Sequence, residues 1–140
     1  MARHKGSISH TNLQRDKVVL DLFRKAKSRV SWPADTMTIC EAAASLPVDR
    51  FYISQDAAVC YVRRRYYHDK VTVYRSHYRQ QLYEALYDAF TIAVGRPENR
   101  YRPLPDIVIN ILQSPAPCLG LAPFQIYLAV LRLKKKKQDD

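Results

Sequence analysis

The sequence predicts an all-α fold of about six helices, arranged as two tandem three-helix units. Three observations lead to this prediction. Apolar residues recur at helical spacing along most of the chain, helix-capping residues and prolines separate these segments, and two segments share the same order of features. The 140 residues, with 47% hydrophobic and 26% charged content, suffice for a buried core without a metal or disulfide.

The first half is expected to hold a flexible basic arm over residues 1–10 and a first unit over residues 11–75. A capping box at Thr11–Gln14, in which a Thr side chain satisfies a free backbone amide, opens a long helix with apolar residues at intervals of three and four. A second capping box at Thr38–Glu41 opens a short helix. Ser54 caps a third helix, whose last turns are basic.

The second unit is expected to span residues 76–136, followed by a frayed tail over 137–140. Ser76 caps its long helix, which carries a wide apolar stripe, and Gly95 with a following proline ends it. Pro123 suits the first position of a last helix, which ends in four lysines.

Two segments, 36–65 and 104–133, align without gaps at an offset of 68 residues (115 − 47). Both read as an apolar helix, a proline break, an apolar pair, and an apolar helix with a basic end. The identical pairs are Ile39 and Ile107, Pro47 and Pro115, Val62 and Val130, and Arg64 and Arg132. This indicates an internal repeat and favours a helix over a strand at 107–112, because the counterpart of that segment is helical.

The two helices that flank the connector Pro47–Ile53 resemble a loose helix-turn-helix. The connector is longer than the usual turn of three or four residues, and the charge lies at the C-terminal end of the second helix. Both features favour contact with the phosphate backbone over reading of bases. Residues 71–74 alternate as in a short β segment, which would add a wing, but they also fit a loop.

The connector reads S-L-P-V-D-R-F-Y-I-S at residues 45–54. It resembles an S-P-A-x-x-F-Y-x-S element of small uncharacterised bacterial and phage proteins, with departures at Leu46 and Val48. The resemblance implies a bacterial or phage origin and no particular activity.

Net charge is the unusual property of this sequence. The chain carries a formal net charge of +10, and the stretch YVRRRYYHDKVTVYRSHYR at 61–79 combines many cations with tyrosines. Cations neutralise phosphates, and tyrosine rings can stack on exposed bases. The candidate nucleic-acid-binding residues are Arg63, Arg64, Lys70, Arg75, Arg79, Tyr66, Tyr67, Tyr74 and Tyr78, with Arg132, Lys134, Lys135, Lys136 and Lys137 from the second unit. Arg65 is expected to lean toward the core.

The function that we expect is nucleic-acid binding, with DNA as the favoured polymer and a regulatory or packaging role. The alternative is a structural or adaptor protein whose basic face docks an acidic protein, for example in a virion or a larger assembly. The sequence leaves open DNA against RNA, sequence preference, oligomeric state and biological process.

The sequence does not support an enzyme, a zinc-binding protein or a membrane protein. No phosphate-binding loop, nucleophile motif or zinc-protease motif is present, so no enzyme activity and no cofactor are expected. Cys40, Cys60 and Cys118 are odd in number and lie in apolar contexts, as expected of buried free thiols in a cytoplasmic protein rather than zinc ligands. No apolar run reaches membrane-spanning length, so no membrane partner is expected.

Overall fold

The computed structural model describes the backbone of residues 5–31 and 34–139, and the side chains of residues 15–31 and 34–135. Six α-helices and no strands are present in this part of the chain, which confirms the all-α prediction. The helices belong to two compact units, one formed by residues 1–46 and 121–140 and the other by residues 47–120.

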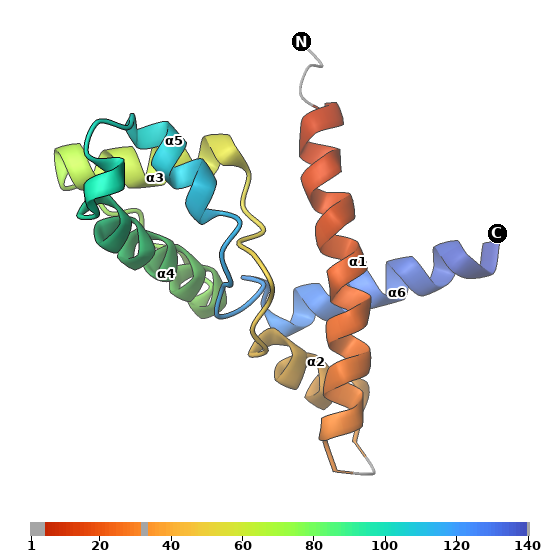
Figure 1. Cartoon of the computed structure of the whole chain (residues 1–140). Helices are drawn as coiled ribbons and strands as arrows, with labels where there is room; N and C mark the ends of the chain where they lie inside the picture. The colour runs from red at the N-terminus through yellow and green to blue at the C-terminus, as the bar shows by residue number, and fades with distance from the viewer. Residues whose placement is uncertain (1–4, 32–33, 140) are drawn as a thin grey trace. The chain divides into compact units, whose positions relative to one another are not determined.

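The first unit contains α1 (Lys5–Arg29), α2 (Thr36–Ala44) and α6 (Pro123–Asp139), and each of these helices contacts the other two (Figure 1). All three turn an apolar face inward. The buried residues are Val19, Leu22, Phe23 and Ala26 on α1, Ile39, Cys40, Ala43 and Ala44 on α2, and Ile126, Ala129 and Val130 on α6. Burial of these faces is the main source of stability for helices of this length.

The second unit contains α3 (Gln55–His68), α4 (His77–Val94) and α5 (Leu104–Ile111), with a short 3₁₀ helix at Pro97–Asn99 (Figure 1). Again each α-helix contacts the other two. The largest buried side chains are Leu86 and Phe90 on α4, Val62 on α3, Val108 on α5, and Leu119 in the connector that follows α5. These residues form the core on which the candidate site rests.

The helices are grouped differently from the expected tandem units, 11–75 and 76–136. The unit with α1 and α2 is completed by α6, and the unit with α4 and α5 is completed by α3. Each half of the sequence therefore supplies a long and a short helix to one unit and its third helix to the other. The non-helical connectors, which contain Pro47 and Pro115, make this exchange possible because a proline cannot continue the preceding helix.

The helix bounds agree with the 68-residue repeat. Thr36 and Leu104 begin the two short helices, and Gln55 and Pro123 begin the two third helices, each pair at this offset. Both members are buried in the pairs Ile39 and Ile107, Cys40 and Val108, Ala43 and Ile111, Ala58 and Ile126, and Val62 and Val130. The same pattern of burial thus builds both units.

The connectors meet within the second unit at equivalent positions of the repeat. Val48 and Ala116 are 68 residues apart and form an isolated antiparallel bridge, with both N–H···O distances 3.0 Å. The amide of Phe51 also donates to the carbonyl of Leu112 at 3.0 Å, and its ring is buried. Phe51 and Tyr52 are both buried and hold the connector to the core of the second unit.

Several local predictions at helix starts need correction. Helix α1 begins at Lys5, so residues 5–10 of the expected flexible arm are helical, and Thr11 lies inside the helix; residues 1–4 lie outside the described chain. No proline interrupts this segment, so nothing in it stops the helix at Thr11. Helix α2 is capped by Asp35, whose carboxylate accepts from the amide of Thr38 at 2.7 Å, and not by Thr38 itself.

The backbone also tests the predicted helix ends and the two segments whose secondary structure the sequence left open. Ser54 and Ser76 cap α3 and α4 as expected, Gly95 ends α4, and residues 107–111 are helical. Residues 71–74 form no strand; they lead into α4 as a loop. Helices α2 and α3, the two helices of the expected helix-turn-helix, belong to different units.

Candidate nucleic-acid interface

Helix α3 carries the three consecutive arginines. The hydroxyl of Ser54 accepts from the amide of Ala57 at 3.2 Å at its start, and Asp56 in the first turn complements the helix dipole. Its buried face consists of Ala58, Tyr61 and Val62. This face fixes the rotation of the helix, and so decides which arginines point away from the core.

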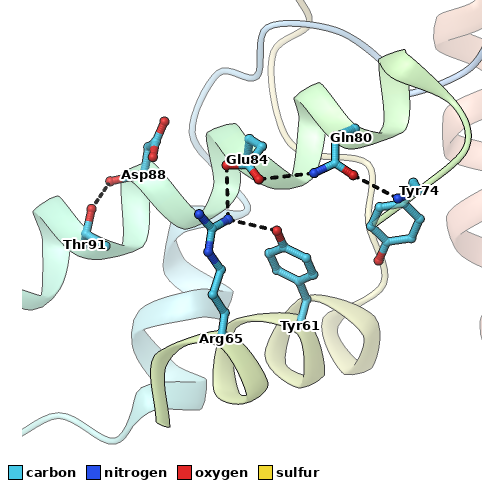
Figure 2. A network of polar contacts seen from close by, with 7 residues as sticks. All are labelled: Tyr61, Arg65, Tyr74, Gln80, Glu84, Asp88 and Thr91. Atoms are coloured by element: carbon cyan, nitrogen blue, oxygen red, sulfur yellow. Dashed lines mark hydrogen bonds and ion pairs between the residues drawn. The ribbon is translucent and has the colours of Figure 1, made fainter. Parts of the chain in front are cut away.

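Arg65 points toward α4 and belongs to a polar network (Figure 2). Its Nη1 atom lies 3.1 Å from Oε2 of Glu84 and donates to the hydroxyl of Tyr61 at 3.0 Å. Its guanidinium carbon lies 4.1 Å from the centre of the Tyr87 ring. Arg65 leans toward the core, as expected from the sequence, and its contacts also join α3 to α4.

Arg63 and Arg64 are exposed and line a pocket between α3 and α5. The α3–α5 pocket has a volume of about 580 Å³. Its basic side is completed by His68 and Lys70, both exposed. Asp69 has a positive φ of 50°, and the turn lets the amide of Lys70 donate to the carbonyl of Arg64 at 3.1 Å. Three candidate cations are thereby brought to one site.

The other walls of the α3–α5 pocket are apolar or uncharged. Val59 of α3 and Pro105 and Ile109 of α5 are half-buried and supply apolar surface. The remaining lining residues are Gln55, Asp56 and Cys60, all exposed. The pocket thus combines an apolar surface with a cationic side, and its volume lies in the range of about 300–1,000 Å³ typical of small-molecule sites.

The candidate tyrosines divide into structural and exposed ones. Tyr74 stacks on Tyr83 with ring centres 4.7 Å apart, and its amide donates to the side chain of Gln80 at 2.9 Å (Figure 2). Tyr78 is half-buried. Tyr66 packs edge-on against Phe90 at 5.1 Å and is 44% exposed, whereas Tyr67 is 62% exposed.

Arg75 and Arg79 lie at the start of α4, outside the lining of the α3–α5 pocket. Both are exposed, and the guanidinium carbon of Arg79 lies 5.5 Å from the centre of the Tyr74 ring. The second unit therefore has two clusters of basic residues, one at the pocket and one at the start of α4.

The candidate residues of α6 belong to the first unit. Arg132 pairs with Asp16 at 2.8 Å, and the Nζ atom of Lys134 lies 5.4 Å from the centre of the Phe23 ring. Lys135 is exposed. The side chains of Lys136 and Lys137 lie outside the described part of the chain. Two of these cations thus already contact groups of α1.

The internal repeat permits a comparison of the exposed faces of α3 and α6. Asp56, Cys60 and Arg63 correspond, at the 68-residue offset, to Phe124, Leu128 and Leu131. The three residues of α6 are between 47% and 58% exposed. The same position in the same three-helix arrangement therefore accepts either polar or apolar residues. Packing does not require an arginine at position 63.

Sequence reasoning missed the side of the pocket that α5 supplies. Pro105 and Ile109 belong to α5, far from the basic stretch in sequence, and no local pattern connects them with it. Cys60 was expected to be buried but is exposed, because it lies away from the Ala58–Tyr61–Val62 face; Cys40 and Cys118 are buried as expected. Helical spacing, applied to α3, would have placed Cys60 on the outer face.

No family model matches the sequence, and no curated protein or solved structure matches it significantly. In the part of the chain whose side chains are described, no cluster of three or more His, Cys, Asp or Glu residues is suited to hold a metal ion. Among the described helices, none combines the length and the apolar character needed to cross a membrane.

Proposed function

We propose that this chain is a small nucleic-acid-binding protein that acts by binding, without catalysis, and contacts its partner mainly through phosphates. The single observation that carries the proposal is the grouping of Arg63, Arg64 and Lys70 around one pocket. Each cation is exposed, so it can replace the counterions of a phosphate chain without a large cost of desolvation. Arg75 and Arg79 would extend the contact along the chain.

Two further observations support the proposal. The repeat comparison argues against a purely structural reason for Arg63, because its counterpart is Leu131. The net charge of +10 adds a long-range attraction for any polyanion. DNA is the polymer favoured in the proposal, with a regulatory or packaging role.

A test of this function is the binding of purified protein to labelled DNA and RNA, each as single strand and duplex, at about 50 and about 200 mM salt. With three phosphate contacts on duplex DNA, affinity should fall by roughly 40-fold between the two conditions. An absence of binding at the lower salt concentration would contradict the proposal.

The alternative, a structural or adaptor protein, is favoured by a different observation. Phe124, Leu128 and Leu131 recur at intervals of four and three on α6 and are exposed, with Tyr127 stacked beside Phe124 at 6.2 Å between ring centres. Exposed apolar stripes of this kind are typical of protein-docking surfaces. An adaptor would purify free of nucleic acid and bind none at low salt.

A further inference from the structure

The α3–α5 pocket has an apolar surface that binding of a duplex phosphate backbone would not use. Phosphates would engage Arg63, Arg64 and Lys70, but the apolar surface formed by Val59, Pro105 and Ile109 offers nothing to a phosphate. In a duplex the bases are stacked and paired, so their faces cannot reach such a surface. A single strand can turn a base outward and place it there.

The arrangement of the lining residues matches the two parts of a nucleotide. The cations and the apolar surface border the same space of about 580 Å³, so a phosphate and a base from one strand can be held together. Gln55 and Asp56 line the pocket from the N-terminal end of α3, whereas the arginines belong to the C-terminal half of this helix. Their side chains offer hydrogen-bond donors and acceptors for the edge of a base.

An exposed ring lies beside the basic side of the pocket. Tyr67 follows Arg63 by four residues and Arg64 by three, which places the three side chains on one side of α3. Its ring is 62% exposed, so it can stack on a neighbouring base of the same strand. The guanidinium planes of the two arginines can stack on bases as well.

We propose that the α3–α5 pocket binds an unstacked nucleotide, so that the protein prefers single-stranded over duplex nucleic acid. This inference rests on the proposed function, because it names the form of nucleic acid that the same surface takes. Phosphates on either side of the bound nucleotide contact Arg63, Arg64 and Lys70, and the base contacts Val59 and Ile109.

Cys60 provides a test in the folded protein. It lines the pocket and is exposed, whereas Cys40 and Cys118 are buried, so a bulky maleimide under native conditions should react at Cys60 alone. Mass spectrometry verifies the single adduct. Affinity is then measured by fluorescence anisotropy for a DNA strand of about 12 nucleotides, an RNA strand of the same sequence, and the DNA duplex. The Cys60→Ala variant, treated in the same way, controls for reaction elsewhere.

The expected result is tighter binding of a single strand than of the duplex, and a loss of about tenfold in single-strand affinity on adduct formation. Duplex affinity should change by less than about twofold, because a duplex contacts the exposed cations and does not enter the apolar part of the pocket. A single strand should also slow the alkylation of Cys60, while the duplex at equal occupancy should not. This second readout does not depend on any variant.

Other outcomes overturn the inference in distinguishable ways. Equal binding of strand and duplex, unaffected by the adduct and without protection of Cys60, leaves the proposed function standing and refutes the pocket as a nucleotide site. No binding of any nucleic acid refutes both. Protection of Cys60 by poly-glutamate, with no binding of any oligonucleotide, assigns the pocket to an acidic protein and also refutes both.

Discussion

The Nη1 atom of Arg65 lies 3.1 Å from Oε2 of Glu84, which commits the last of three consecutive arginines to packing between α3 and α4. Arg63 and Arg64 precede it directly and are exposed at the α3–α5 pocket. One basic triplet therefore combines a packing residue with two exposed cations, and substitutions within it should separate stability from the proposed binding.

Arg65→Ala should destabilise the fold without weakening nucleic-acid binding. The change removes the pair with Glu84, leaves the Tyr61 hydroxyl without its donor and takes the guanidinium off the Tyr87 ring. Because the arginine is mostly buried while Glu84 is partly exposed, we expect a loss of about 1–2 kcal/mol in the free energy of unfolding, measured in urea. Arg63→Ala, the matched control, should change it by less than about 0.5 kcal/mol. The opposite ranking of the two variants would contradict the assignment.

Gly120→Ala should also destabilise the second unit. Gly120 has a φ of 86°, and a Cβ at this position would come within 2.5 Å of Cδ2 of the buried Leu82. The backbone conformation alone costs a non-glycine residue about 1–2 kcal/mol, before any shift of Leu82.

Gly95→Ala is the control for this prediction. Gly95 ends α4 with a φ of −81°, and an added Cβ would meet only carbonyl oxygens at 3.6 and 3.8 Å. Thermal unfolding should show a clear decrease in the melting temperature for the Gly120 variant and little change for the Gly95 variant. Equal effects would mean that the turn at Gly120 is not constrained as described.

Stability should fall at alkaline pH through Tyr83. Burial, together with the neighbouring Tyr74, raises the pKa of the Tyr83 hydroxyl far above its usual value. In the unfolded chain this pKa is about 10, so the unfolded state releases the proton first. The stabilisation is complete below about pH 10 and is lost as the pH rises above it, by up to about 1.4 kcal/mol per pH unit.

The contribution of Tyr83 to this pH dependence can be measured by urea unfolding. The wild type and Tyr83→Phe are compared at pH values from about 8 to about 11. Burial also raises the pKa of Tyr61, Cys40 and Cys118, but these groups are present in both proteins and cancel in the comparison. The wild type should lose stability more steeply above about pH 10. Parallel profiles would show that Tyr83 ionises as freely in the fold as in the unfolded chain.

Local features of the fold could be predicted from the sequence because their causes are local. Ser76 and Gly95 bound α4 correctly, since capping and termination depend on a few neighbouring residues. The sequence predicted a capping box at Thr38–Glu41 and not a cap at Asp35, which is the N-cap of α2. The carboxylate of Asp35 in fact accepts from the Thr38 amide.

The grouping of the helices could not be predicted, for a physical reason. Helices α3 and α6 carry the same buried pattern, Ala58 and Val62 in one and Ile126 and Val130 in the other. Either helix can therefore cover either pair of long and short helices, and periodicity does not distinguish the two pairings. The α3–α5 pocket depends on this choice, which is why Ile109 was not assigned to the site.

The most direct test of nucleic-acid binding compares two triple variants of equal charge change. One variant carries Arg63→Ala, Arg64→Ala and Lys70→Ala at the pocket. The other carries Arg24→Ala, Lys25→Ala and Lys27→Ala, three exposed positions on α1. The measurement is the slope of log affinity against log salt for a labelled single strand.

The pocket variant should lower the magnitude of this slope by about 2, since each phosphate contact on a single strand contributes about 0.7. The α1 variant should leave the slope close to that of the wild type. If both variants lower it equally, binding follows overall charge and the pocket is not the interface. If neither lowers it, the three cations at the pocket do not contact phosphate.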